Sequence, residues 1–130
     1  MLGAALLVHP ALGLRTLPAE RPMGRGARWS MGLVALLVGG GFVSGWLLYP
    51  GYRAGHKREL LAQDPLVAQL FESKEHLAWY TLVLCLGGIV AAWGGGPAGR
   101  RTGAGLFAAA ALTAIGTAAL GAVVGATGGR

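Results

Sequence analysis

The sequence predicts an all-α, polytopic integral membrane protein, with four transmembrane helices in one small bundle over residues 1–130. The first observation is composition: 54% of the residues are hydrophobic and 12% are charged, whereas soluble domains carry about 25% charged residues. The second is a set of long runs without Lys, Arg, Asp or Glu, at residues 1–14, 29–52, 77–99 and 102–129. A helix needs about 20 apolar residues to cross a bilayer. Three runs meet that length, and a soluble enzyme is excluded.

The first predicted span, residues 1–17, is short and contains Pro10 near its middle. At ~1.5 Å per residue it measures roughly 21–26 Å, less than the ~30 Å of a hydrocarbon core. Proline removes a backbone donor and kinks a helix, and neighbouring helices must cover the carbonyl it frees. We therefore expect a short, kinked helix that packs inside the bundle.

The second span is predicted at residues 29–49. Ser30 is a residue type that caps helix N-termini, and Pro50 is expected to end the helix. Gly41 and Gly45 have the GxxxG spacing that lets two membrane helices approach closely. We predict that this pair lies at a helix–helix contact.

The third helix is predicted at residues 65–93, with its membrane part from about residue 76. Pro65 follows Asp64 and suits the first helical position. Polar residues recur at intervals of three and four, which indicates one polar helix face: Gln69, Glu72, Ser73, His76 and Tyr80. The opposite face is predicted to carry Leu66, Leu70, Leu77 and Leu84.

The fourth span is predicted at residues 102–127, which are rich in alanine and glycine. Gly121 and Gly125 form a second GxxxG pair, for which we also predict helix packing. The preceding GGGPAG stretch, residues 94–99, is expected to be a flexible turn.

The net charge of +6 indicates topology rather than nucleic-acid binding, because the basic residues are scattered between apolar runs. Short loops rich in Lys and Arg stay in the cytoplasm. The connections around residues 18–28 and 94–101 are basic, whereas residues 50–75 carry equal numbers of basic and acidic residues. The sequence therefore predicts a multi-pass protein of the bacterial cytoplasmic membrane with both termini outside.

The outer loop, residues 50–75, is predicted to include a short interfacial helix. Tyrosine and arginine are common anchors in protein interfaces, and both also suit the lipid headgroup region. Five residues in and beside this loop are predicted to contact a partner or lipid: Tyr49, Tyr52, Arg53, Glu72 and Glu75.

Histidine within membrane helices raises the possibility of a b-type haem, and His9 and His76 are the candidate ligands. The helical rise places their imidazoles at depths that differ by on the order of 10 Å, which argues against both binding one iron. The alternative for His9 is a neutral imidazole that hydrogen-bonds to a carbonyl freed by Pro10.

No set of nucleophile, base and orienting residue can be assembled from this sequence, and no metal site is predicted. The lone cysteine, Cys85, has the apolar context of a packing residue. The sequence favours a non-catalytic accessory subunit of a larger membrane complex of the energy-transducing, electron-transport type. It would bind no cofactor or soluble substrate, and its partners would be lipid and other membrane subunits. The alternatives are a haem b electron-transfer subunit and a small homo-oligomeric carrier.

Overall fold

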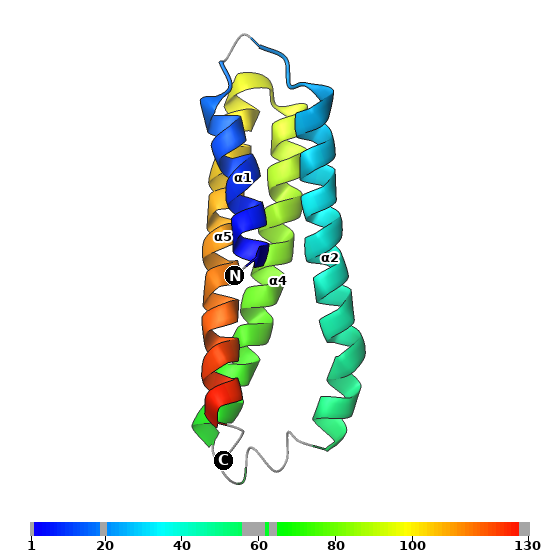
Figure 1. Ribbon diagram of the computed structural model, residues 1–130, viewed down its shortest axis with the longest axis vertical. Helices are drawn as coiled ribbons and strands as arrows, with labels where there is room; N and C mark the ends of the chain where they lie inside the picture. The colour runs from blue at the N-terminus through cyan, green and yellow to red at the C-terminus, as the bar shows by residue number, and fades with distance from the viewer. Residues whose placement is uncertain (1, 19–20, 56–61, 63–64, 128–130) are drawn as a thin grey trace.

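The computed structural model describes residues 2–18, 21–55, 62 and 65–127, and it confirms the all-α class. The helices run side by side along the long axis of the molecule, and each is antiparallel to the next along the chain (Figure 1). They are α1 (Leu2–Thr16), α2 (Arg25–Ala54), α4 (Pro65–Gly94) and α5 (Gly96–Thr127).

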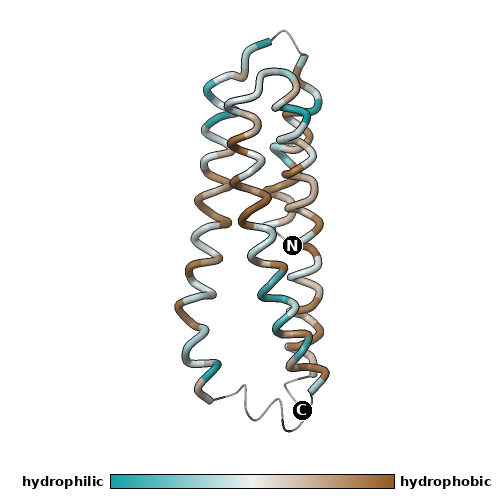
Figure 2. The backbone as a smooth tube through the Cα atoms, turned by 180° about the vertical axis from the view of Figure 1, so that it is seen from behind, coloured by the Kyte–Doolittle hydropathy of each residue, from teal (hydrophilic) through white to brown (hydrophobic). Residues whose placement is uncertain are grey.

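Three of these helices, α2, α4 and α5, are long and apolar enough to cross a membrane. Hydrophobic residues follow one another along much of their length (Figure 2). α1 has 15 residues, or about 22 Å, and extends from one end of the bundle to about half its height (Figure 1). The three long helices support a multi-pass membrane protein, whereas α1 is shorter than the ~20 residues of a full crossing.

The start of α2 differs from the predicted one. The helix begins at Arg25, so Ser30 lies inside it and the predicted N-cap is wrong. The backbone N–H of Arg28 donates to the carbonyl of Gly24 at 3.3 Å, which already forms the first turn. The hydroxyl of Ser30 faces α1 instead, where it lies 3.5 Å from the imidazole of His9.

The end of α2 also differs, because the helix continues through Pro50 to Ala54. The predicted stop at Pro50 is therefore wrong. A proline ring fixes φ near the helical value, so the residues that follow can remain helical although one hydrogen bond is lost. The N–H of Gly55 donates to the carbonyl of Gly51 at 3.3 Å beyond the proline. Pro10 likewise lies inside α1.

The predicted flexible turn at residues 94–99 is wrong, because the connection between α4 and α5 is Gly95 alone. Gly96 has φ of +56°, a conformation that favours glycine, and it opens the new helix. Pro97 follows in the first turn, where a missing N–H costs no helical hydrogen bond. The predicted range of the third helix, residues 65–93, agrees with the observed bounds of α4, Pro65–Gly94.

A ladder of glycines brings the backbones of α4 and α5 together below this turn. The ladder consists of Gly95, Gly99 and Gly103, which follow one another at intervals of four. A Cβ atom added to Gly103 would lie 2.8 Å from the carbonyl oxygen of Gly88, and one on Gly99 would overlap the carbonyl of Ala91. No side chain fits between the helices at these positions, so the sequence GxxxGxxxG is required by close packing.

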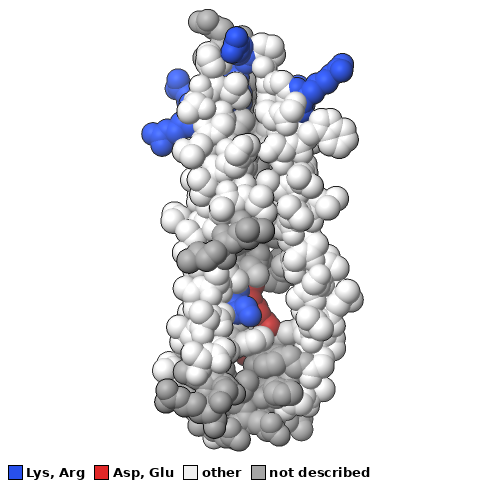
Figure 3. Space-filling model, viewed as in Figure 1, with Lys and Arg blue, Asp and Glu red and all other residues white. Residues whose placement is uncertain are grey.

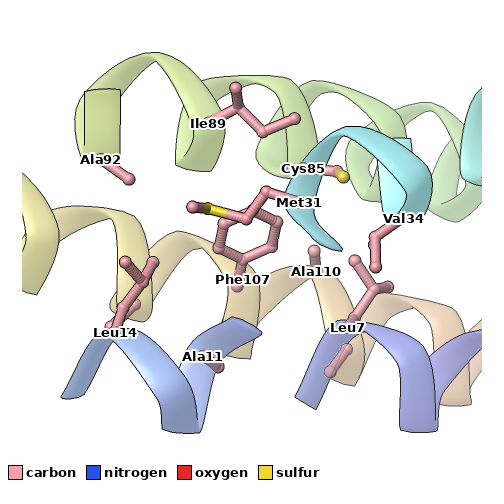
Figure 4. Packing of buried hydrophobic residues seen from close by; sticks show 12 residues of the cluster. Leu7, Ala11, Leu14, Met31, Val34, Cys85, Ile89, Ala92, Phe107 and Ala110 are labelled. Carbon is pink, nitrogen blue, oxygen red and sulfur yellow. The ribbon is translucent and has the colours of Figure 1, made fainter. Parts of the chain in front are cut away.

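All four described helices contribute to one apolar core (Figure 4). It is centred on Phe107, which is fully buried in α5. α1 provides Leu7, Ala11 and Leu14, α2 provides Met31 and Val34, α4 provides Cys85, Ile89 and Ala92, and α5 provides Ala104, Phe107, Ala110 and Ala111. Because α1 covers only half of the bundle, this core lies in that half. The predicted packing of the first helix is confirmed for this one face, whereas Val8 and Leu12 on α1 are exposed.

α2 separates from α4 and α5 in the half of the bundle that α1 does not reach (Figure 1). The rings of Phe42 and Trp79 bridge the two sides edge to face, with centroids 4.4 Å apart. A Cβ atom added to Gly41 or Gly45 would meet nothing within 4 Å. The predicted helix contact of this pair is therefore not made among the described residues, and contact with another chain stays a prediction.

The second predicted glycine pair also makes no close helix contact with the part of the chain that the structure describes. An added Cβ would meet nothing within 4 Å at Gly125, and at Gly121 it would meet only the flexible side chain of Lys74, at 3.7 Å. The tight contacts between α4 and α5 lie nearer the turn, together with a hydroxyl pair, Thr81 and Thr113, whose oxygens are 2.8 Å apart.

Candidate functional site

Charged residues mark the two ends of the apolar region. We call the end with the α4–α5 turn the basic end, where Lys and Arg side chains project from the surface (Figure 3). It is defined by Arg15, Arg21, Arg25, Arg28, Arg100 and Arg101. At ~1.5 Å per residue, Lys74 lies about 30 Å from Gly94 along α4, which matches the thickness of a hydrocarbon core. Glu20 lies outside the described residues.

Arg100 is the buried cation of the basic end, with 7% of its surface exposed. Its Nη1 donates to the carbonyl oxygen of Arg21 at 2.6 Å and to that of Pro18 at 3.4 Å. Arg100 thereby fastens the α1–α2 connection to the first turn of α5. The one signal for this role in the sequence is the position of Arg100 beside the α4–α5 turn, and by itself that position indicates only topology.

His9 lies on α1 at the wall of a small groove between α1 and α2, and its side chain is exposed. The groove has a volume of about 220 Å³ and is mainly apolar. The Nδ1 atom of His9 lies 3.5 Å from the hydroxyl oxygen of Ser30, the polar neighbour that the sequence did not reveal. His9 therefore faces another helix at this position, as well as sitting beside Pro10.

His76 lies on the exposed face of α4, and its Nδ1 donates to the carbonyl oxygen of Glu72 at 2.8 Å. The other predicted members of this polar face, Gln69, Glu72, Ser73 and Tyr80, are exposed too, so the predicted polar face is confirmed. On the opposite face, Leu70, Leu77 and Leu84 are partly buried, whereas Leu66 is exposed.

The two histidines are far apart in depth. His9 lies about 10 Å from Thr16 and His76 about 27 Å from Gly94, and both reference residues are at the basic end. The difference of about 17 Å exceeds the separation that the sequence indicated, because α1 begins at mid-height (Figure 1). One haem iron therefore cannot be bound by both histidines of one chain. Ligation by either histidine alone stays a prediction.

The residues predicted to contact a partner or lipid lie at the end opposite the basic end. Arg53 and Glu72 are exposed, Tyr49 and Glu75 are partly buried, and the side chain of Tyr52 lies outside the described residues. Figure 3 shows a hollow between α2 and the α4–α5 pair, in which acidic and basic side chains are visible. Most of the predicted interfacial helix, within residues 50–75, lies outside the described residues.

Among the residues that the structure describes, no group of three or more His, Cys, Asp or Glu could hold a metal ion. Cys85 is fully buried in the apolar core, as expected for a packing residue. Comparison of the chain with protein-family models, with curated proteins and with solved structures gave no match.

Substitution of His9 distinguishes a role in helix packing from a role as a haem ligand. We expect His9→Gln to preserve assembly, because glutamine also donates and accepts near Ser30, and His9→Leu to weaken it by about 1 kcal/mol. Thermal unfolding in mild detergent measures the difference, and an absorbance scan of each sample detects haem. A wild-type Soret band that disappears in His9→Gln would contradict the packing role.

Proposed function

We propose that this protein is a non-catalytic accessory subunit of a larger membrane complex. The observation that carries the proposal is the second half of α2, which stands apart from the other helices of its own chain. Val43, Trp46, Leu47 and Leu48 are each at least half exposed there, and Gly41 and Gly45 have no neighbour close to an added Cβ. A helix with small residues on an open face is suited to close packing against a further helix.

We further propose that the complex is an energy-transducing one of the electron-transport type in a bacterial cytoplasmic membrane, where small accessory subunits of this kind occur. The basic end would face the cytoplasm, since short connections rich in arginine are retained there. In this orientation the C-terminal end of α5 is outside, and the hollow opens toward the outer leaflet.

The mass of the native particle tests the proposal. We expect protein extracted in mild detergent to form a particle that contains a chain of different mass from its own 13.2 kDa. A particle made only of copies of the 13.2 kDa chain would instead favour the homo-oligomeric carrier. An absorbance scan of the same sample tests the electron-transfer alternative, which requires a Soret band.

Substitution of Gly41 tests whether the open face of α2 is the surface through which the native particle assembles. Gly41→Leu should weaken association about tenfold, because a leucine side chain separates two close backbones, while the isolated chain should unfold at an unchanged temperature. Gly105→Leu on α5 is the matched control, because an added Cβ there also meets nothing within 4 Å. Normal assembly of Gly41→Leu would show that this face of α2 contacts lipid.

A further inference from the structure

A cavity at the basic end combines positive charge with an interfacial position. It has a volume of about 250 Å³ and lies between the α1–α2 connection, the start of α2 and the α4–α5 turn. Its walls include Arg21, Met23, Arg28, Trp93, Gly96 and Arg100, and no acidic residue is among the described residues that line it. Three arginines therefore line one small volume.

The three arginines have different tasks in this cavity. Arg100 is buried, and its bond to the carbonyl of Arg21 fixes the backbone of the cavity rim. Arg21 and Arg28 also line the cavity, and both are exposed to solvent. A guanidinium is always charged, and its planar fork matches two oxygens of a phosphate group. The lining thus suits a phosphate better than a single-point anion.

The position of the cavity identifies the source of the phosphate. Trp93 forms part of its wall with about half of its surface exposed, and Trp29 on α2 is 79% exposed near the same end. Exposed tryptophans at the ends of membrane helices lie at the level of lipid headgroups. Basic pockets between membrane helices on the cytoplasmic side bind anionic headgroups. We propose that this cavity binds the phosphate of an anionic phospholipid, a role that is independent of the accessory function but rests on the proposed orientation of the basic end toward the cytoplasm.

Quenching of Trp93 by brominated lipid tests this site directly. A reporter with Trp93 as its one tryptophan carries Trp29→Phe, Trp46→Phe and Trp79→Phe, and it is placed in phosphatidylcholine nanodiscs. We expect brominated phosphatidylglycerol to quench Trp93 at a lower mole fraction than brominated phosphatidylcholine does. Equal quenching by the two lipids would overturn the proposal. Native mass of the unmodified chain, with retained phosphatidylglycerol as the readout, repeats the test without the tryptophan substitutions.

Two double variants, each of which removes two arginines, distinguish a specific phosphate site from a general attraction between the basic end and anionic lipid. Arg21→Gln with Arg28→Gln should lower the preference for phosphatidylglycerol about fivefold for each arginine. Arg25→Gln with Arg101→Gln removes the same charge from exposed positions of the basic end that do not line the cavity. This control should keep the preference within about twofold. Equal losses in the two pairs would show that only the overall surface charge matters.

Inorganic phosphate tests the remaining alternative, a site for soluble phosphate. In phosphatidylcholine nanodiscs, potassium phosphate and potassium chloride at equal ionic strength should give the same unfolding temperature. A rise in that temperature with phosphate, combined with equal quenching by the two lipids, would identify a site for soluble phosphate and overturn the lipid proposal.

Discussion

Replacing Gly103 with leucine is expected to destabilise the chain by about 3 kcal/mol, the upper end of the usual cost of overpacking. A Cβ atom alone at this position would lie 2.8 Å from the carbonyl oxygen of Gly88 and 3.1 Å from the Cβ of Ala92. Neither neighbour can move away easily, because one is backbone and the other is a buried residue of α4. The two helices must therefore separate next to Phe107, at the centre of the core.

The matched control is Gly105→Leu, two residues further along α5. An added Cβ on Gly105 meets nothing within 4 Å, so this variant should unfold within about 0.5 kcal/mol of the wild type. Unfolding of both variants by denaturing detergent, followed by circular dichroism, measures the difference. Equal stability of Gly103→Leu and Gly105→Leu would contradict the glycine ladder.

Removal of the Arg100 guanidinium is expected to release the connection between α1 and α2. Hydrogen bonds to a charged group are each worth about 1.5–3 kcal/mol, and Arg100→Met loses two of them, to the carbonyls of Pro18 and Arg21. We expect a loss of about 2–3 kcal/mol, because water can reach part of this end and replace some of the lost donors.

Limited proteolysis by trypsin measures this release at the place where it happens. Cleavage after Arg25, which is followed by Gly26, should be faster in Arg100→Met than in Arg101→Met, whose side chain is exposed at the next position. Both variants lose one arginine, so charge and the number of cleavage sites are matched. Identical cleavage rates would mean that the loop is held by other contacts.

Much of the fold could be predicted from the sequence, because long uncharged runs depend on composition and not on tertiary contacts. The ends of the helices are harder to predict from the sequence. Pro50 is a residue type that usually ends a helix, yet its fixed φ is compatible with a continuing helix. Residues 94–99 have the composition of a turn, but packing against α4 makes most of them helical and turns their glycines into a contact surface.

The candidate site could be predicted only in part, since sequence spacing places a residue on a face but does not say which helix lies opposite. The pairs at residues 41 and 45 and at 121 and 125 have the same spacing as the ladder but meet no backbone among the residues that the structure describes. The proximity of His9 and Ser30 depends on the register between α1 and α2. The bonds from Arg100 join positions about 80 residues apart in the sequence, which no local pattern indicates.

The single-residue connection at Gly95 has a consequence for the order of folding. α4 and α5 can pair as soon as both have been synthesised, since the loop that must close between them has almost no entropy to lose. α1 leaves the ribosome first, but it packs mainly against α5, and its Leu7 reaches the core beside Ala110 (Figure 4). Its docking therefore closes a loop of about 100 residues, the slowest kind of contact to form. Among the four described helices, α1 is synthesised first and is accordingly expected to dock last.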